Sequence, residues 1–333
     1  MELRGGKVVT KNGKPLRYAG GFCVVFPYEK STGEKVAVRC WTAHVPNADR
    51  RSRQISQCLQ QSGLPYFVRF EYIAQGIATQ IGIFPIVIMD WVNATPLKDY
   101  LQTNIKNSSA IKTLADEFLK MTNELHRFGF SHGDLQHGNI MVSTTGQLFL
   151  VDYDSMFVPG LEDVTDEIKG LAGYQHPGRL NIKYLSPKSD YFSELIIYSS
   201  LLTLAKYPRL WNELNIEDTE TLVFTQDDLD NPSISSIIQM LKSDTELAEC
   251  AYAIERALEK TDIEDLLPLN EAIVPESVKI IGGLHEKWKS RYVPENIESP
   301  IDKENLKIKW SKSKVEELTI PIDLTPISSK WKK

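Results

Sequence analysis

Residues 131–154 read SHGDLQHGNIMVSTTGQLFLVDYD, and this stretch decides the fold. It contains two short apolar runs, Ile140–Val142 and Leu148–Val151, separated by a Thr-Thr-Gly sequence. Apolar runs of this length on either side of turn residues are typical of a β-hairpin. The stretch therefore predicts a hairpin with a polar loop before it and an acidic loop after it.

Three side chains in these loops suit phosphoryl transfer: Asp134, Asn139 and Asp152. Transfer from a nucleotide needs an acidic residue that orients the acceptor hydroxyl and oxygen ligands that hold Mg²⁺ on the phosphates. Asp134 and Asn139 flank one loop, and the hairpin would return Asp152 to the side of Asn139. Either aspartate alone would be interpreted as a turn or cap residue. Together with Asn139 they predict a catalytic site.

The first 92 residues have the composition of strands. Valine, isoleucine and aromatic residues cluster in five short runs, which are Leu16–Tyr18, Phe22–Tyr28, Lys35–Trp41, Tyr66–Ile73 and Ile83–Val92. The turns between the first three runs indicate an antiparallel meander. A helix is predicted over Ala48–Ser62, ended by Gly63 and Pro65. Its first turn contains three arginines, which oppose the helix dipole there; this pattern hints at a nearby anion, although a solvated face is the more ordinary interpretation.

After Val92 the pattern becomes helical. An apolar stripe with a 3.6-residue period begins at Ser109, with serines placed to cap the helix and Gly129 placed to end it. Asp190–Ala205 is apolar over most of its circumference, which predicts a buried helix. Further helices are predicted at Ser233–Leu241 and Thr245–Lys260. From about residue 285 the periodicity is lost, and we expect an extended or partly disordered tail over 285–333.

Composition excludes several classes of protein. The chain has 333 residues, of which 42% are hydrophobic and 25% charged, as in an ordinary globular protein. A net charge of −6 argues against nucleic-acid binding by bulk electrostatics. Four widely spaced cysteines support neither a zinc site nor a disulfide framework. Without a secretory or membrane-spanning segment in this sequence, we expect a cytoplasmic protein that binds no nucleic acid and no membrane.

The motifs resemble those of the protein-kinase-like superfamily. That family has a catalytic loop of the form H-R-D-x-x-x-x-N and a metal-binding D-F-G, and this chain has H-G-D-L-Q-H-G-N and D-Y-D. Val36-Ala37-Val38-Arg39 looks like the family's V-A-I-K strand, and Asp90-Trp91-Val92 looks like its hinge. His176-Pro177-Gly178 occupies the place of A-P-E, and Asp190 that of the aspartate that anchors the catalytic loop.

The resemblance implies an α+β, bilobal protein-kinase-like fold with ATP and Mg²⁺ as cofactors. Residues 1–92 would form a small antiparallel lobe with one helix, and residues 93–284 a mainly helical lobe. Asp134 would orient the acceptor hydroxyl, and Asn139 and Asp152 would bind the metal. The nucleotide-binding residues implied by the motifs are Gly20, Gly21, Ala37, Arg39, Asp90 and Val92.

Several positions depart from the family pattern. Arg39 stands where the family has its phosphate-gripping lysine, and a guanidinium fork does not reproduce an ammonium in the same geometry. No acidic residue occurs between Arg50 and Arg69, where the partner glutamate should lie. Gln136 replaces a lysine that points toward the transferred phosphate. Gly133 replaces an arginine that receives activation-loop phosphate, so control through that residue is not expected.

Three functions remain open from these residues. The motifs look closest to bacterial serine/threonine-kinase-like proteins encoded with tellurium-resistance and stress operons, whose members also have arginine in the V-A-x-R strand. That resemblance implies a protein substrate and operon-encoded partner proteins. Gly133 and the D-Y-D ending are similar to aminoglycoside phosphotransferases, which implies a small-molecule acceptor. The family's Gly-rich loop is reduced here to residues 19–24, Ala-Gly-Gly-Phe-Cys-Val. This weak loop and the missing Lys–Glu pair suggest instead a pseudokinase scaffold that binds nucleotide without transfer.

Overall fold

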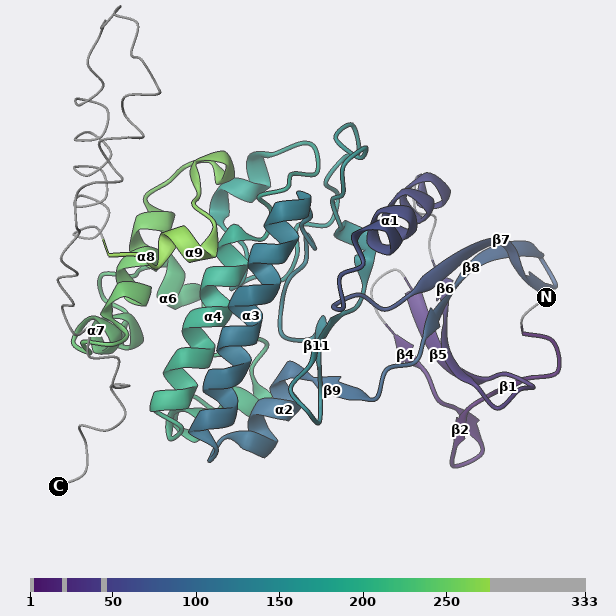
Figure 1. Ribbon diagram of the computed structural model, residues 1–333, viewed down its shortest axis with the longest axis horizontal. Helices are drawn as coiled ribbons and strands as arrows, with labels where there is room; N and C mark the ends of the chain where they lie inside the picture. The colour runs from purple at the N-terminus through teal and green to yellow at the C-terminus, as the bar shows by residue number, and fades with distance from the viewer. Residues whose placement is uncertain (1–2, 20–22, 43–46, 276–333) are drawn as a thin grey trace, which may run out of the picture. The chain divides into compact units, whose positions relative to one another are not determined.

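The computed structural model describes residues 3–19, 23–42 and 47–275, which lie in one compact unit, Met1–Glu276. Within this unit an antiparallel sheet lies on one side and a bundle of helices on the other, so the α+β bilobal prediction is confirmed (Figure 1). The lobe boundary at residues 92 and 93 stays a prediction. The predicted tail, Gly20 and Gly21 lie outside the described residues.

The N-terminal sheet has the strand order β1-β5-β6-β8-β7, with β4 also paired to β5, and all of these pairs are antiparallel. Its strands are β1 (Lys7–Val8), β4 (Tyr18–Ala19), β5 (Cys23–Glu29), β6 (Lys35–Trp41), β7 (Phe70–Thr79) and β8 (Gly82–Asp90). The predicted meander is therefore confirmed for β4, β5 and β6. A small hairpin of β2 (Thr10–Lys11) and β3 (Lys14–Pro15) was not predicted, because its residues carry no apolar alternation.

Strand β7 begins at Phe70, four residues later than the predicted strand. The residues before it leave the N-terminal sheet and reach the catalytic hairpin, where the Leu150 N–H donates to the carbonyl of Tyr66 at 2.7 Å. Phe67 forms an isolated parallel bridge with Leu150. This segment therefore joins the two halves of the unit.

Helix α1 (Ala48–Ser62) has the predicted bounds. Its face carrying Ile55 and Leu59 is buried, and Gly63 ends the helix in the left-handed region at φ 63°. Glycine is the usual residue at this position because it has no Cβ to clash. The same buried face packs in the cluster that contains Phe70 and Val87 of the sheet.

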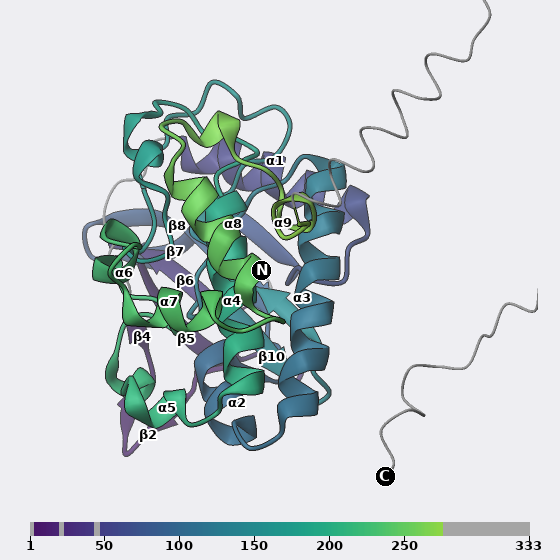
Figure 2. The ribbon, with the colours of Figure 1, turned by 90° about the vertical axis from the view of Figure 1, so that its left-hand side faces the viewer.

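The second half of the unit holds the predicted hairpin and a helical bundle. Strands β10 (Ile140–Ser143) and β11 (Leu148–Leu150) form the hairpin, and β9 (Ala94–Pro96) adds an unpredicted third strand. Helices α3 and α4 run side by side in both ribbon views (Figures 1 and 2). The helices are α2 (Leu97–Asn104), α3 (Ser108–Phe128), α4 (Tyr191–Lys206), α5 (Leu210–Glu213), α6 (Gln226–Asp230), α7 (Ser236–Lys242), α8 (Ala248–Leu258) and α9 (Leu269–Ala272).

The start of α3 differs from the prediction in its cap. The side chain of Asn107, not a serine, accepts the hydrogen bond from the Ala110 N–H at 3.1 Å. Gly129 ends the helix at φ 67°, as predicted. Helix α4 is buried around nearly its whole circumference, and buried hydroxyls such as Ser200 and Thr203 donate to carbonyls one turn earlier. Their polar groups are thereby satisfied inside the core.

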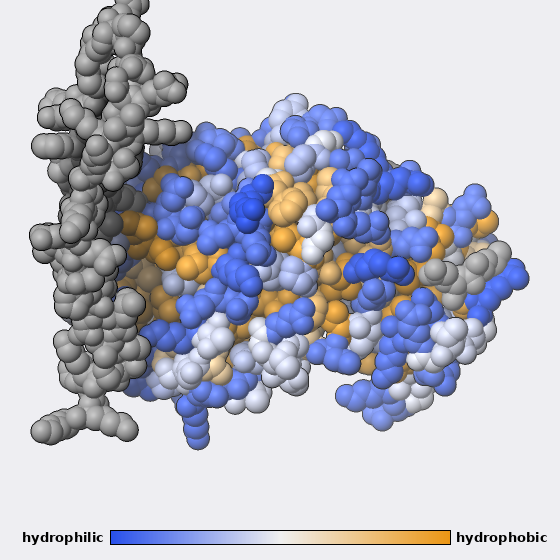
Figure 3. All heavy atoms as spheres, in the orientation of Figure 1, coloured by the Kyte–Doolittle hydropathy of each residue, from blue (hydrophilic) through white to orange (hydrophobic). Residues whose placement is uncertain are grey.

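Hydrophilic residues cover most of the face shown in Figure 3, with apolar patches between them. In the part of the chain that the structure describes, no helix combines the length and apolarity needed to span a bilayer.

Candidate active site

Asp190, the residue before α4, anchors the loop that precedes the hairpin. One oxygen of its buried carboxylate accepts the Gly133 N–H at 2.9 Å, and the other accepts the His132 N–H. His132 is itself fully buried, and its Nε2 lies 2.8 Å from the carbonyl of Val151. The loop and the residue before Asp152 are thus tied together through one imidazole.

Gly133 has a backbone that excludes any side chain. Its φ is +77°, and a Cβ added there would lie 2.0 Å from the carbonyl oxygen of Ser155. The positive φ and the contact with Ser155 both disfavour the arginine that many family members have at this position. The glycine therefore reflects close packing against the D-Y-D turn and says little about the acceptor.

Asp134 and Asn139 lie in contact. The Asn139 amide donates to the Asp134 carbonyl at 2.8 Å and to the Asp134 carboxylate at 3.0 Å. The second carboxylate oxygen accepts the Leu171 N–H at 3.1 Å. Burial raises the pKa of Asp134, against the opposing effects of His132 and Asn139. The carboxylate is held in one orientation, and its remaining lone pairs are available to an acceptor hydroxyl.

Asp152 follows the hairpin in the left-handed region at φ 67°, and about half of its side chain is exposed (46%). The Val151 N–H donates to the Asn139 carbonyl at 3.0 Å, so the hairpin does bring the two loops together. The Oδ1 atom of Asp152 lies 3.1 Å from the Nη2 atom of Arg39. Asp152, the predicted metal ligand, thus forms an ion pair with Arg39, the residue predicted to bind phosphate.

The Arg39 guanidinium is buried, with a side chain only 7% exposed. Besides Asp152 it contacts Asp154, the last residue of D-Y-D, through a hydrogen-bonded ion pair. Its guanidinium carbon lies 5.9 Å from the centroid of the Trp41 ring. Burial lowers the pKa of Arg39, but Asp152 and Asp154 outweigh it, so the pKa is raised. Arg39 is therefore a permanent cation.

The predicted adenine side lies on neighbouring strands. Ala37 of β6 is buried and faces Met89 of β8 in the register, one position before Asp90. The Asp90 N–H donates to the Arg69 carbonyl at 2.9 Å, which orients the start of the hinge. Val92 follows in the connection to β9.

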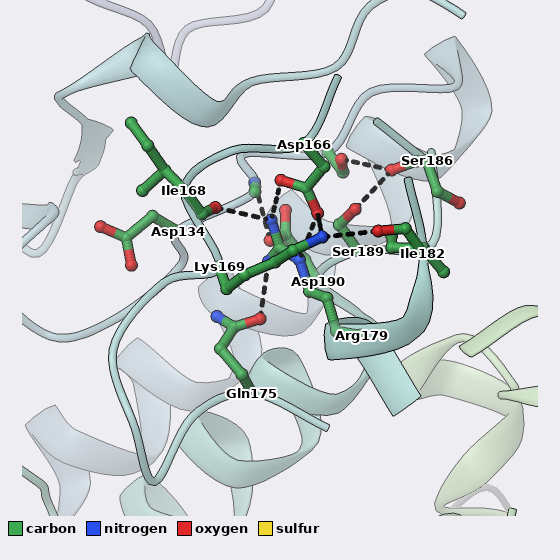
Figure 4. A network of polar contacts seen from close by, with 12 residues as sticks. Asp134, Asp166, Ile168, Lys169, Gln175, Arg179, Ile182, Ser186, Ser189 and Asp190 are labelled. Atoms are coloured by element: carbon green, nitrogen blue, oxygen red, sulfur yellow. Dashed lines mark hydrogen bonds and ion pairs between the residues drawn. The ribbon is translucent and has the colours of Figure 1, made fainter. Parts of the chain in front are cut away.

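The segment after D-Y-D is pinned by a buried ion pair between Asp166 and Arg179 (Figure 4). Arg179 donates through Nε and Nη2 to the two carboxylate oxygens, each at 3.1 Å, and both side chains are at most 1% exposed. Its Nη1 also donates to Gln175 at 2.6 Å. This network holds the segment whose Leu171 N–H contacts Asp134, without any phosphate group.

Two side chains of the catalytic loop, those of Gln136 and His137, form hydrogen bonds with the protein itself. The side-chain Oε1 of Gln136 accepts the Gly138 N–H at 2.7 Å, so the side-chain amide caps its own loop. Nδ1 of His137 lies 2.7 Å from the hydroxyl of Tyr174. Burial, together with the nearby Lys98, lowers the pKa of His137 to about 4, so the ring is neutral at pH 7.

The arginines at the start of α1 meet carboxylates of the protein. Arg50 binds Asp163 through two contacts of 2.7 and 2.8 Å, and Arg53 binds Asp49 at 2.5 Å. The anion that their position hinted at is thus supplied by the chain for these two. The Nη2 atom of Arg51, in contrast, is buried and has no partner among the described residues.

The donor set fits the cofactor that the family implies. Mg²⁺ prefers oxygen ligands and is usually held by one or two protein side chains together with phosphates and water. Asp152 offers a half-exposed carboxylate, and Asn139 keeps its amide oxygen while its nitrogen is bound to Asp134. Asn139 and Asp152 would hold the ion, and Arg39 would face the phosphates.

Sequence reasoning missed Asp154 as the acidic partner of Arg39. The available signal was the second aspartate of D-Y-D in a chain without a glutamate on α1. The two partners are 115 positions apart, so spacing alone could not pair them.

Comparison with known proteins agrees with this geometry. The family described as "Protein kinase domain" matches residues 19–262. A probable serine/threonine-protein kinase of Streptomyces coelicolor is 24% identical over 205 residues, which are 57% of this chain and 29% of that protein. Another, PknB of Bifidobacterium longum, is 24% identical over 187 residues, 51% of this chain and 26% of that protein. PknB of Mycobacterium leprae is 26% identical over 130 residues, 38% of this chain and 21% of that protein.

The chain thus spans less than a third of the length of these curated relatives. The family match covers more than half of this chain and includes the catalytic loop, the hairpin and the D-Y-D turn. The chain belongs to the protein kinase domain family.

Proposed function

We propose that this chain transfers the γ-phosphoryl group of magnesium-bound ATP to a hydroxyl of a protein substrate. The observation that carries the proposal is the contact of Asn139 with Asp134 on one side and, through its carbonyl, with the backbone before Asp152 on the other. One short loop thereby brings the Asp134 carboxylate close to Asn139 and Asp152, which supports an acceptor-orienting role for the first and metal-binding roles for the other two. The similarity to serine/threonine kinases supports a protein acceptor.

Each residue has a distinct role in this proposal. Asp134 orients the acceptor hydroxyl and accepts its proton as the oxygen attacks the γ-phosphorus. Asn139 and Asp152 hold the ion, which when bound neutralises developing charge on the phosphates. Arg39 holds phosphate oxygens. Ala37 and the backbone of Asp90 and Val92 face adenine. Gly20 and Gly21, which lie outside the described residues, keep their predicted nucleotide-binding role.

The proposal includes the resemblance to kinases encoded with tellurium-resistance operons, and with it operon-encoded partner proteins and a cytoplasmic location. Arg39 would then be a residue that this group of kinases shares. The small-molecule alternative loses one of its two supports, because Gly133 is required by its contact with Ser155.

A nucleotide-binding scaffold is favoured by one observation. Asp152 is paired with Arg39, so a metal ion must compete with a guanidinium for this carboxylate. If Arg39 never released it, nucleotide would bind without productive alignment of its phosphates.

The experiment that separates these functions uses γ-labelled ATP and Mg²⁺ with the purified full chain. We expect label on the chain itself or on a generic protein such as casein. Label on an aminoglycoside alone would establish the small-molecule alternative. A rise of Tm with ATP and Mg²⁺ but no transfer to any acceptor would establish the scaffold. If the chain shows neither transfer nor a rise of Tm, all three functions are overturned.

A further inference from the structure

Arg39 has two acidic neighbours that differ in how firmly they are held. The Asp152 side chain is 46% exposed, whereas that of Asp154 is 19% exposed. Asp154 lies in a 3₁₀ turn, Tyr153–Ser155, which the Met156 N–H closes by donating to the Tyr153 carbonyl. Asp152 is the residue immediately before this turn.

The turn that carries Asp154 is fixed by buried contacts. The hydroxyl of Tyr153 donates to the Leu150 carbonyl at 2.7 Å and accepts the Val68 N–H at 2.8 Å. Ser155 packs against Gly133, where no Cβ would fit. The backbone of Asp154 therefore cannot shift away from Arg39 without disturbing the core, whereas the more exposed Asp152 side chain has room to turn toward a metal ion.

Helix α1 does not supply the acid that a buried cation needs. It presents Arg51, which lines a cavity of about 30 Å³ together with Arg39, Trp41 and Asp154. The Nη2 atom of Arg51 has no partner among the described residues. A second cation at this place repels Arg39, so the acid that compensates Arg39 has to come from outside the helix.

Other contacts attach α1 to the rest of the unit. Arg50 binds Asp163, and the Gln54 amide donates to the Pro159 carbonyl at 2.7 Å. The contacts of Arg50 and Gln54 thus attach the helix without Asp154, although Arg51 of the helix also feels the charge of Asp154.

We propose that Asp154 is the positioning residue that holds Arg39 toward the nucleotide phosphates, replacing a glutamate on the helix. This inference rests on the proposed function. When Asp152 turns to the metal ion, the buried guanidinium keeps Asp154 as its anion and its remaining N–H groups face the phosphates.

The test compares Asp154→Asn with the unaltered chain in ATP binding, by calorimetry with ATP and Mg²⁺, and in steady-state transfer. Loss of the charged partner is expected to raise the Kd and KM for ATP about tenfold, with a smaller effect on kcat. Asp116→Asn is the matched control, because Asp116 is an exposed residue of α3 and its variant should bind ATP as the unaltered chain does.

A relocated acid distinguishes positioning from a merely structural role. Arg51→Glu places a carboxylate on the helix side of the same cavity. Combined with Asp154→Asn it should bring the Kd and KM back to within about threefold of the original values. Arg51→Glu alone should weaken ATP binding, because its carboxylate would repel that of Asp154 in the same cavity. The double variant also serves if Asp154→Asn alone fails to fold.

The outcomes separate this inference from the proposed function. If Asp154→Asn binds ATP with an unchanged Kd, Asp154 does not position Arg39. If the double variant folds and binds no better than Asp154→Asn, the positioning role is likewise excluded. If the unaltered chain binds ATP but transfers nothing, the proposed function fails, while the Kd comparison still decides the role of Asp154. If it binds no nucleotide at all, both fail.

Discussion

At position 133 the backbone conformation and the carbonyl of Ser155 act together against a side chain. We predict that Gly133→Ala lowers the free energy of unfolding by about 3 kcal/mol or more, since strained φ and a backbone clash add. Urea denaturation followed by circular dichroism measures the change. ATP binding should fall with it, because the displaced Ser155 belongs to the turn that holds Asp154.

Gly146 provides the matched control for this substitution. Its φ is +85°, but an added Cβ would meet only the Tyr100 hydroxyl, at 3.9 Å. Gly146→Ala should therefore cost only the left-handed conformation, about 1–2 kcal/mol. Equal losses for the two variants would show that the contact with Ser155 is unimportant.

The buried pair of Asp166 and Arg179 is predicted to be among the costliest ion pairs to break. Arg179→Met leaves a fully buried carboxylate with only the Lys169 ammonium, at 3.2 Å, and should lower the free energy of unfolding by about 3 kcal/mol. Arg209→Met removes an exposed pair with Glu213, at 60% and 49% exposure, and should cost about 0.5 kcal/mol or less. Thermal and urea unfolding of both variants test the contrast, which similar losses would contradict.

Helices α3 and α4 are joined by a pair whose charge depends on pH. His126 lies 2.8 Å from Glu194, which is 2% exposed. Burial opposes protonation of His126, but the hydrogen bond and charge of Glu194 prevail and raise its pKa. Burial raises the pKa of Glu194 as well, against the effect of His126. Both shifts mean that the folded chain binds protons more tightly than the unfolded chain.

A group with a raised pKa stabilises the fold fully below its unfolded pKa and loses this effect as pH rises through the folded pKa. For His126 the loss begins above about pH 6.5. We predict that the unaltered chain is more stable than Glu194→Gln, and that this difference shrinks from pH 6 to pH 9. Urea unfolding across that range measures it. A difference that grows with pH would contradict the assigned pair.

The bounds of helices and strands were predictable where neighbouring residues in the sequence determine them. The bounds of α1 and the end of α3 follow from apolar periodicity and the glycines at 63 and 129. Strand β9 was missed because three residues without alternation form a strand only when β10 is available as a partner. The Asn107 cap was missed because the neighbouring serines have a similar preference for the same role.

In the molecule as a whole, motif spacing predicted that the loops of Asp134, Asn139 and Asp152 come together, but not the charges around Arg39. Asp134, Asn139 and Asp152 lie within 18 positions of each other, and the hairpin between them is readable from sequence. The contacts of Arg39 with Asp154 and of Arg50 with Asp163 join residues more than 100 positions apart. Such pairs depend on how the lobes fold against one another, which local patterns do not report.

The central claim is that Asp134 orients an acceptor hydroxyl for transfer of a phosphoryl group from ATP. Its most direct test is the transfer rate of Asp134→Asn at saturating γ-labelled ATP and Mg²⁺, beside the unaltered chain and Asp116→Asn. We predict that Asp134→Asn loses about 100-fold or more of the rate while its Kd for ATP changes less than about threefold. Transfer by Asp134→Asn at the rate of the unaltered chain would contradict the account.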